Sequence, residues 1–329
     1  MLYTYAIEPD ALATWNKCRH LLDLMGFQHG RAIAAYPTRK RWKALVRAAC
    51  RANADLGDRD RRRILRKLDQ SNAALVRSDG IDYDNTISPA EECWIRNAAV
   101  RQTAAHAFHA ILATRNPDGH PDVVLEEDVE ASHEKLDIPR EAPVLREPAA
   151  LAAHVNALVT NSRELLLIDR HFNPSVRRWR PVMRACIELA EQSVRDNPTV
   201  TIHTLVPDRT QTDVEDFRAL CVRHIPNMLF GRITSVRICC WRRRDRDRHD
   251  FHARYLLTDR GGYALDKGLD EERGVEQPVG LLDDRECQRL REGYSSANPF
   301  FEKADAFTLD KSGKLRPELP RVQSTKRPQ

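Results

Sequence analysis

The chain lacks any apolar run of about 18 residues, the length that a membrane-spanning helix requires. Its first residues, MLYTYAIEPD, also lack the basic start and the apolar core of a secretory signal. We therefore expect a soluble, cytoplasmic protein with no membrane partner. A phosphate-binding P-loop and a G-x-G-x-x-G loop are absent as well, so nucleotide hydrolysis of those kinds has no support in the sequence.

The eight cysteines include no C-x-x-C pair. Most of them fall inside apolar stretches, where a thiol behaves as a small hydrophobic group. We interpret them as reduced core cysteines rather than as disulfides or zinc ligands, and we expect no metal and no other cofactor.

The net charge of +5 says little about partners, but the distribution of arginine says more. Arginine is commoner than lysine, and it clusters in three places, Arg59–Arg63, Arg177–Arg180 and Arg242–Arg248. A guanidinium suits bidentate phosphate contact better than an ammonium does, which favours a phosphate-bearing partner. Aspartates interleave many of these arginines, so an ordinary solvated surface is an equally open interpretation.

A length of 329 residues exceeds the usual size of one core, so we expect two domains. The first part has helical spacing and helix-start signals, among them a Thr38 cap and the sequence SPAEE at Ser88. Three helices are expected there, at 41–56, 59–76 and from Ser88 to about Thr114. These features predict a mainly α-helical N-terminal domain over residues 1–120.

The stretch 121–148 is acidic, contains several prolines and loses clear periodicity, which predicts a linker. Beyond it, short apolar runs alternate with amphipathic helices, a pattern typical of a mixed α/β sheet with right-handed crossovers. Strands are expected at Leu165–Asp169, Thr199–Val206 and Ser235–Trp241, and in two further segments joined by the turn at Gly261 and Gly262. The α/β domain should span residues 149–309, followed by a disordered basic tail over 310–329.

One strand of this domain carries the residues best suited to chemistry. In FHARYLLTD, His252, Arg254 and Asp259 follow the order His-x-Arg-x(4)-Asp, and His252 and Arg254 should project from the same strand face. An imidazole can attack phosphorus or move a proton, while a guanidinium holds the non-bridging oxygens of a phosphate. Asp259 could orient the imidazole or a neighbouring cation.

This segment resembles the motif of the phospholipase D superfamily, His-x-Lys-x(4)-Asp followed by a glycine-containing segment. Gly268, Asp270 and Glu271 occupy the place of that segment. The resemblance implies a phospholipase D-like mixed sheet flanked by helices, with a histidine that becomes covalently phosphorylated. It also implies a second histidine, which a single-motif chain obtains from a homodimer partner. Arg254 replaces the lysine of the family pattern, which puts catalysis in doubt more than phosphate binding.

Two further groups of residues are candidate substrate-binding positions. Asp169 and His171 follow the strand at Leu165–Asp169, at the sheet edge where open α/β sheets place their ligands, although such residues often only cap a strand. The arginines just before the motif, Arg242, Arg243 and Arg244, could direct a nucleic-acid backbone toward His252 or could form a solvated loop.

These observations favour a metal-independent phosphodiesterase, a bacterial nuclease in defence or mobile-element biology, acting on DNA rather than RNA. Its N-terminal domain would recognise a protein partner. The alternative is a catalytically inactive module that binds nucleic acid or a protein partner. A lipid phosphodiesterase is less favoured because no amphipathic anchor is visible. His252 could also be an ordinary histidine on a strand edge, with Arg254 and Asp259 as a surface pair.

Overall fold

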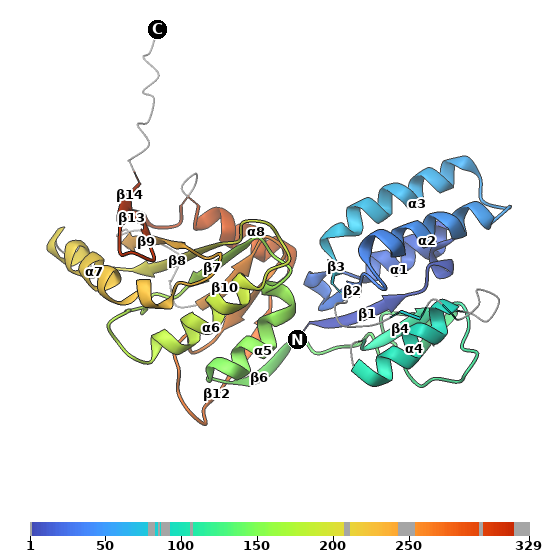
Figure 1. Ribbon diagram of the computed structural model, residues 1–329, viewed down its shortest axis with the longest axis horizontal. Coiled ribbons are helices and arrows are strands. Elements are labelled where there is room, and N and C mark those ends of the chain that lie inside the picture. Colours follow the sequence, from blue (N-terminus) through green and yellow to red (C-terminus); the bar gives the residue numbers. More distant parts are fainter. Residues whose placement is uncertain are drawn as a thin grey trace, which may run out of the picture.

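The computed structural model describes residues 2–77, 83–84, 86, 93–105, 108–206, 211–242, 254–295 and 299–318. These residues form two α/β domains, each built on its own β-sheet (Figure 1). Within the described ranges, no helix has the length and apolar character needed to cross a membrane. The seven cysteines whose surroundings are described are all buried and free, as the sequence predicted for the thiols in apolar stretches.

The first domain contains a five-stranded, wholly parallel sheet of order β3-β2-β1-β4-β5. Its strands are β1 (Tyr3–Ile7), β2 (Arg31–Ala34), β3 (Leu75–Val76), β4 (Ala110–Ala113) and β5 (Val123–Leu125). Its helices are α1 (Trp15–Leu24), α2 (Arg39–Ala52), α3 (Asp58–Gln70) and α4 (Cys93–Ala105). Figure 1 shows α2 and α3 on one side of these strands and α4 on the other, so the sheet is covered on both faces.

The expectation of a mainly helical N-terminal domain is therefore wrong. The residues expected to end two of the helices form strands instead, β3 and β4. Both strands are short and β4 is alanine-rich, and short apolar runs of this kind do not separate helix from strand by periodicity. The prediction of α2 is confirmed, and its Thr38 hydroxyl accepts a hydrogen bond from the Arg41 amide at 3.2 Å.

The second domain contains a nine-stranded mixed sheet of order β14-β13-β9-β8-β7-β10-β11-β12-β6. Its strands are β6 (Glu141–Leu145), β7 (Glu164–Ile168), β8 (Thr199–Leu205), β9 (Ser235–Arg242), β10 (Arg254–Thr258), β11 (Gly262–Leu265), β12 (Glu276–Leu281), β13 (Glu302–Asp310) and β14 (Leu315–Pro317). β7, β8 and β9 are parallel, and the remaining pairs are antiparallel. The predicted mixed α/β class is confirmed at this level.

Helices cover both faces of the second sheet. Apolar side chains of α5 (Pro148–Val159), α6 (Trp179–Glu191) and α7 (Gln211–His224) pack in one core cluster with Leu165, Leu167 and other strand residues. The opposite face forms a smaller cluster under α8 (Asp284–Gly293), where Leu290 packs with Trp241 and Phe301. Successive apolar side chains of a central strand are therefore divided between two cores, as in β7, where Leu165 and Leu167 lie in the first cluster and Ile168 lies in the second.

The expected linker and tail also differ from the structure. Residues 121–148 supply β5 to the first sheet and β6 to the second, so both ends of the stretch are held by strand pairing. The proline in β6, Pro143, concealed this strand, but β6 is an edge strand, where proline is tolerated. In the tail, β14 pairs with β13, and residues 319–329 lie outside the described part of the chain.

The two domains meet along a continuous apolar contact. Phe27, Ala32 and Val76 of the first domain belong to the same buried cluster as the core of the second domain. Among the described residues, hydrogen bonds cross the seam from Arg260 Nη1 to the Leu75 carbonyl at 2.8 Å and from the Arg77 amide to Asn161 Oδ1 at 3.3 Å.

Candidate functional site

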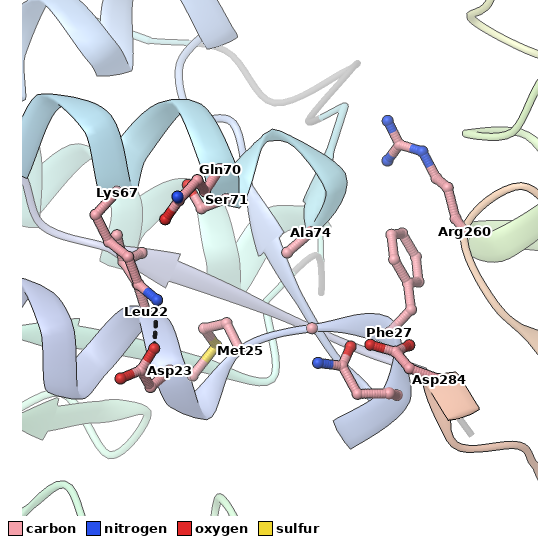
Figure 2. Close-up of a pocket in the computed structure, with 12 residues that line it drawn as sticks. Leu22, Asp23, Met25, Phe27, Lys67, Gln70, Ser71, Ala74, Arg260 and Asp284 are labelled. Atoms are coloured by element: carbon pink, nitrogen blue, oxygen red, sulfur yellow. Dashed lines mark hydrogen bonds and ion pairs between the residues drawn. The ribbon is translucent and has the colours of Figure 1, made fainter. Parts of the chain in front are cut away.

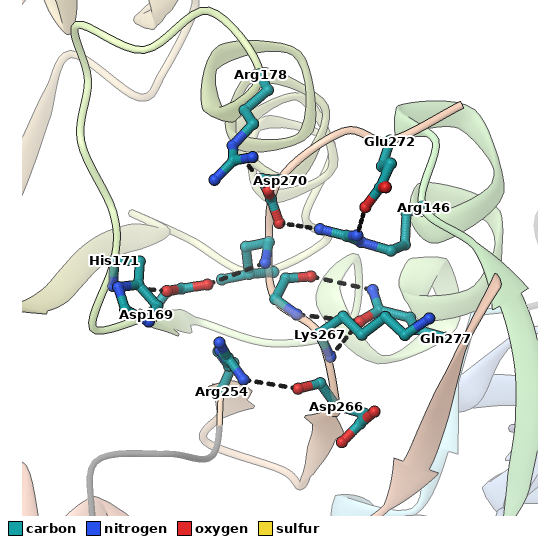
Figure 3. Close-up of polar contacts among 12 residues, drawn as sticks. Arg146, Asp169, His171, Arg178, Arg254, Asp266, Lys267, Asp270, Glu272 and Gln277 are labelled. Carbon is teal, nitrogen blue, oxygen red and sulfur yellow. Dashed lines mark hydrogen bonds and ion pairs between the residues drawn. The ribbon is translucent and has the colours of Figure 1, made fainter. Parts of the chain in front are cut away.

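Three chain segments of the second domain converge at the end of β7. This strand runs into Asp169, while β10 runs antiparallel beside it with Tyr255 paired to Ile168. One step further along this register, Arg254 therefore lies across from Asp169. The segment that follows β11 closes the site, because the Leu269 amide donates to the Asp169 carboxylate and Asp270 comes directly after it (Figure 3).

Asp169 is 1% exposed and is held by backbone donors on two sides. Its Oδ1 accepts a hydrogen bond from the His171 amide at 2.9 Å, and its Oδ2 accepts one from the Leu269 amide at 3.0 Å. Burial raises the pKa of Asp169 to about 6, against the opposing effects of these amides and of Arg254. Asp169 thus ties the end of β7 to the segment after β11.

Arg254 is partly fixed by the same segment. Its Nη1 donates a 2.8 Å hydrogen bond to the Asp266 carbonyl, whereas its buried Nε has no hydrogen-bond partner in the described structure. Gly268, with φ of 125°, leaves room here. A Cβ on Gly268 would lie 2.9 Å from Asp169 Oδ2 and 3.2 Å from Asp270 Oδ1, so a larger residue would disturb both carboxylates, whereas Arg254 Nε at 3.8 Å would only be in ordinary contact.

A second buried carboxylate, Asp270, is neutralised by two arginines. Asp270 forms ion pairs with Arg146, a residue only 6% exposed, and with Arg178 Nε at 3.0 Å. Arg146 also pairs with Glu272, and the Glu271 amide donates to the Arg178 carbonyl at 2.8 Å. Figure 3 shows this network above Asp169, with Arg178 coming from the segment before α6. The Arg178 side chain is 61% exposed, so one face of its guanidinium meets solvent.

The His171 imidazole lies among cations. Arg170 Nε donates to His171 Nε2 at 2.8 Å, which leaves that nitrogen unprotonated. The pKa of His171 is lowered by partial burial and by repulsion from Arg170, Arg254 and Arg178. A neutral imidazole whose Nε2 accepts from Arg170 carries its proton on Nδ1, which can donate to a ligand, and the cations around it favour an anion.

The arrangement as a whole is a basic surface over two buried acids. Asp169 and Asp270 are occupied by their own amides and arginines, so they add little negative charge at the surface. Arg178 and Arg254 remain to contact a ligand. Two guanidinium groups around a neutral imidazole suit a phosphate group, since each can supply paired N–H donors.

Five other residues were expected at this site: His252, Asp259, Arg242, Arg243 and Arg244. His252, Arg243 and Arg244 lie outside the described residues. Arg242 ends β9, and since β7, β8 and β9 are parallel it lies at the same sheet edge as Asp169, two strands away.

Asp259 is not at this site, which corrects its expected role as an orienting acid. It follows the far end of β10, about 16 Å from Arg254 at ~3.3 Å per residue. There its Oδ1 accepts hydrogen bonds from the amides of Arg163 and Glu164, at 2.7 and 3.2 Å. A five-residue strand is too long for both of its ends to face one ligand.

Three important residues were missed by the sequence reasoning. Arg146 and Arg178 hold Asp270, and the Gln277 amide group bonds both the amide and the carbonyl of Gly268, at 3.1 and 3.0 Å. Arg178 belongs to a cluster that the sequence did show. Nothing in the sequence marks Arg146 or Gln277, because their roles depend on the pairing of β6 with β12.

Comparison with known proteins adds little. No protein-family model and no curated protein matches the chain. A solved structure of TrmBL2, an archaeal chromatin protein reported to show a novel mode of DNA binding, is similar over 75% of this chain and 83% of its own, with 14% identity and a TM-score of 0.24. A score this low carries no argument about fold or function. In the described part of the chain, no group of three His, Cys, Asp or Glu side chains is placed to hold a metal ion.

Proposed function

We propose that the second domain is a phospholipase D-like phosphodiesterase that holds a phosphodiester between Arg254, Arg178 and His171. The observation that carries the proposal is the position of Arg254. It begins a central strand, lies across from the end of β7, and keeps its buried Nε without a hydrogen-bond partner among the described residues.

The reaction requires His252, two positions before Arg254 on the chain. Its imidazole attacks phosphorus, the bond between phosphorus and the leaving oxygen breaks, and a water molecule later hydrolyses the phosphohistidine. Arg254 and Arg178 stabilise the negative charge on the non-bridging oxygens. The leaving oxygen takes a proton from a second histidine, supplied by another copy of the chain in a homodimer. The substrate is a nucleic acid, DNA in preference to RNA.

Cleavage of labelled DNA in the presence of EDTA tests the proposal. The wild type should cleave, His252→Ala should be inactive, and Arg254→Ala should lose at least a hundredfold, in keeping with the loss of one oxyanion-stabilising donor. Arg66→Gln removes an exposed arginine of α3 that lies outside the three arginine clusters, and this matched control should leave the activity unchanged. Equal cleavage by the wild type and His252→Ala would refute the mechanism.

A non-catalytic module that binds nucleic acid is the second candidate, and one observation favours it. The Arg254 guanidinium is held in place by the Asp266 carbonyl, which suits a fixed phosphate clamp more than a mobile catalytic cation. This candidate predicts DNA binding with a steep salt dependence and no turnover by the wild-type protein.

A further inference from the structure

A cavity of about 250 Å³ lies at the seam between the two domains (Figure 2). Most of its lining comes from the first domain, from the end of α1, the turn at residues 26–28 and the end of α3. Arg260, which follows β10, and Asp284, which begins α8, complete the lining from the second domain. Arg260 is separated from Arg254 by about 20 Å along β10, so the cavity is distinct from the proposed catalytic site.

One part of the lining is apolar and packed. Its side chains are each at most 7% exposed: Leu22, Met25, Phe27 and Ala74. The guanidinium carbon of Arg260 lies 5.6 Å from the centre of the Phe27 ring, and Figure 2 shows this side chain above Phe27 at one side of the cavity. Aromatic rings and guanidinium planes are the groups on which nucleobases stack. This part of the cavity therefore suits a flat ring system.

Some of the polar groups around the cavity are already engaged within the protein. Lys67 of α3 forms an ion pair with Asp23 of α1, drawn as a dashed line in Figure 2. The Ser71 hydroxyl donates a 2.9 Å hydrogen bond to the Leu68 carbonyl. These groups shape the cavity and are not needed to explain what it binds.

Three other polar groups of the lining remain available to a ligand. In the described part of the chain, the amide groups of Gln28 and Gln70 and the carboxylate of Asp284 make no side-chain hydrogen bond or ion pair. Burial raises the pKa of Asp284, opposed by His29 and assisted by Asp283. An amide group can both donate and accept, and a carboxylate accepts, so a ligand needs donors and acceptors to satisfy all three.

The size and charge of the cavity limit the ligand further. Pockets for drug-sized molecules usually hold about 300–1,000 Å³, so this one suits a smaller compound. The charged side chains of the lining are two acids and two bases, Asp23, Asp284, Lys67 and Arg260. Because these charges balance, the lining favours a neutral molecule. A small, flat, neutral molecule with donors and acceptors on its edge is a nucleobase.

Guanine fits the available groups better than adenine does. Its N1–H and its N2 amino group are neighbouring donors that one carboxylate can accept together, while its O6 and N7 accept from an amide group. Adenine has no such pair of neighbouring donors. The carboxylate of Asp284 therefore favours guanine.

We propose that the seam cavity binds a guanine base, carried by a nucleoside or a nucleotide. The ring lies against Phe27 and Arg260, and its donor edge meets Asp284. Its acceptors take hydrogen bonds from Gln28 or Gln70. Because both domains line the cavity, the bound base holds them together.

Thermal unfolding of the full chain tests the proposal, with guanosine as the probe. Guanosine should raise the melting temperature, and Asp284→Asn and Gln70→Ala should each weaken the apparent affinity roughly tenfold. Both side chains are exposed, so the melting temperature without guanosine should change little. Asp137→Asn removes an exposed carboxylate that is not part of the cavity lining, and this matched control should bind guanosine like the wild type.

Inosine, which lacks the N2 amino group, separates recognition of the base from damage to the fold. The wild type should bind guanosine about tenfold more tightly than inosine, and Asp284→Asn should lose most of this preference. A general loss of structure would weaken both ligands equally. No response to guanosine, inosine or adenosine, or adenosine binding as tightly as guanosine, would overturn the proposal.

Guanosine 5′-monophosphate identifies the form in which the base is bound. Tighter binding than that of guanosine assigns a nucleotide, and equal binding assigns the nucleoside. Either result supports the site, and neither depends on DNA cleavage.

Amide hydrogen exchange tests whether the bound base holds the two domains together. The Arg77 amide donates to Asn161 Oδ1 across the seam, so guanosine should slow its exchange in the wild type. At the same guanosine concentration, Asp284→Asn should show less protection. Guanosine binding that leaves the exchange of this amide unchanged would contradict the bridging role.

Discussion

Replacing Arg146 with methionine should destabilise the second domain strongly. The substitution keeps the bulk of the side chain but removes the main partner of Asp270, whose side chain is only 5% exposed. The remaining partner, Arg178, is 61% exposed and its interaction is screened by solvent. Breaking a buried pair on one side leaves an uncompensated charge and costs about 3–5 kcal/mol. Urea unfolding, read from the transition of the second domain, measures this loss.

A double variant separates the charge from the packing. Arg146→Met with Asp270→Leu replaces the buried pair by apolar groups of similar size, so most of the lost stability should return. Arg178→Gln is the matched control on the exposed side of Asp270, and it should cost less than about 1 kcal/mol. A single Arg146→Met variant as stable as the wild type, or a double variant as unstable as the single one, would refute the reasoning.

Three other predictions concern single residues. Burial lowers the pKa of His203 from 6.5 to about 3, so the unfolded chain binds a proton at this histidine below pH 6.5 while the folded protein does not. The free energy of unfolding should therefore fall by about 2 kcal/mol between pH 7 and pH 5. Urea unfolding measures this loss, and His203→Gln should not show it. Gly268→Ala should cost about 1–3 kcal/mol and weaken DNA binding in an anisotropy assay, because the new Cβ meets Asp169. Asp259→Ala should cost about 1–2 kcal/mol of unfolding free energy yet leave DNA cleavage unchanged, since Asp259 lies away from Arg254.

Five consecutive strands of the second domain, β7 to β11, could be predicted because their sequences are unambiguous, whereas β6, β12, β13 and β14 were not predicted. The run at Leu165–Ile168 is apolar and ends in Asp169, and the segments that form β8 and β9 are rich in β-branched residues and cysteine. Buried parallel strands have this composition, and the turn at Gly261 separates the next two strands. The same pattern placed Asp169 and His171 at the carboxyl end of a strand, but it did not predict the antiparallel pairing of β10 with β7 that brings Arg254 beside them.

The first domain could not be predicted in the same way. β2 and β4 are four residues long, and β4 has the sequence AILA, which suits a helix equally well. Their strand conformation is stabilised by pairing with β1, a contact between residues more than 20 positions apart. Local spacing carries no information about such pairing.

The remaining parts of the site depend on pairing as well. Arg146 and Gln277 reach the site because β6 joins the sheet through β12. Asp259 was instead assigned to the site by the sequence, because its spacing from Arg254 matches a motif. The strand between the two residues keeps them apart.

Mass spectrometry of a quenched reaction tests the account most directly. The protein is mixed with a DNA oligonucleotide, stopped at alkaline pH and digested. A nucleotidyl phosphate adduct is expected on the peptide that contains His252, reduced in Arg254→Ala and absent from His252→Ala. DNA cleavage without any adduct on that peptide, or no cleavage and no adduct at all, would contradict it.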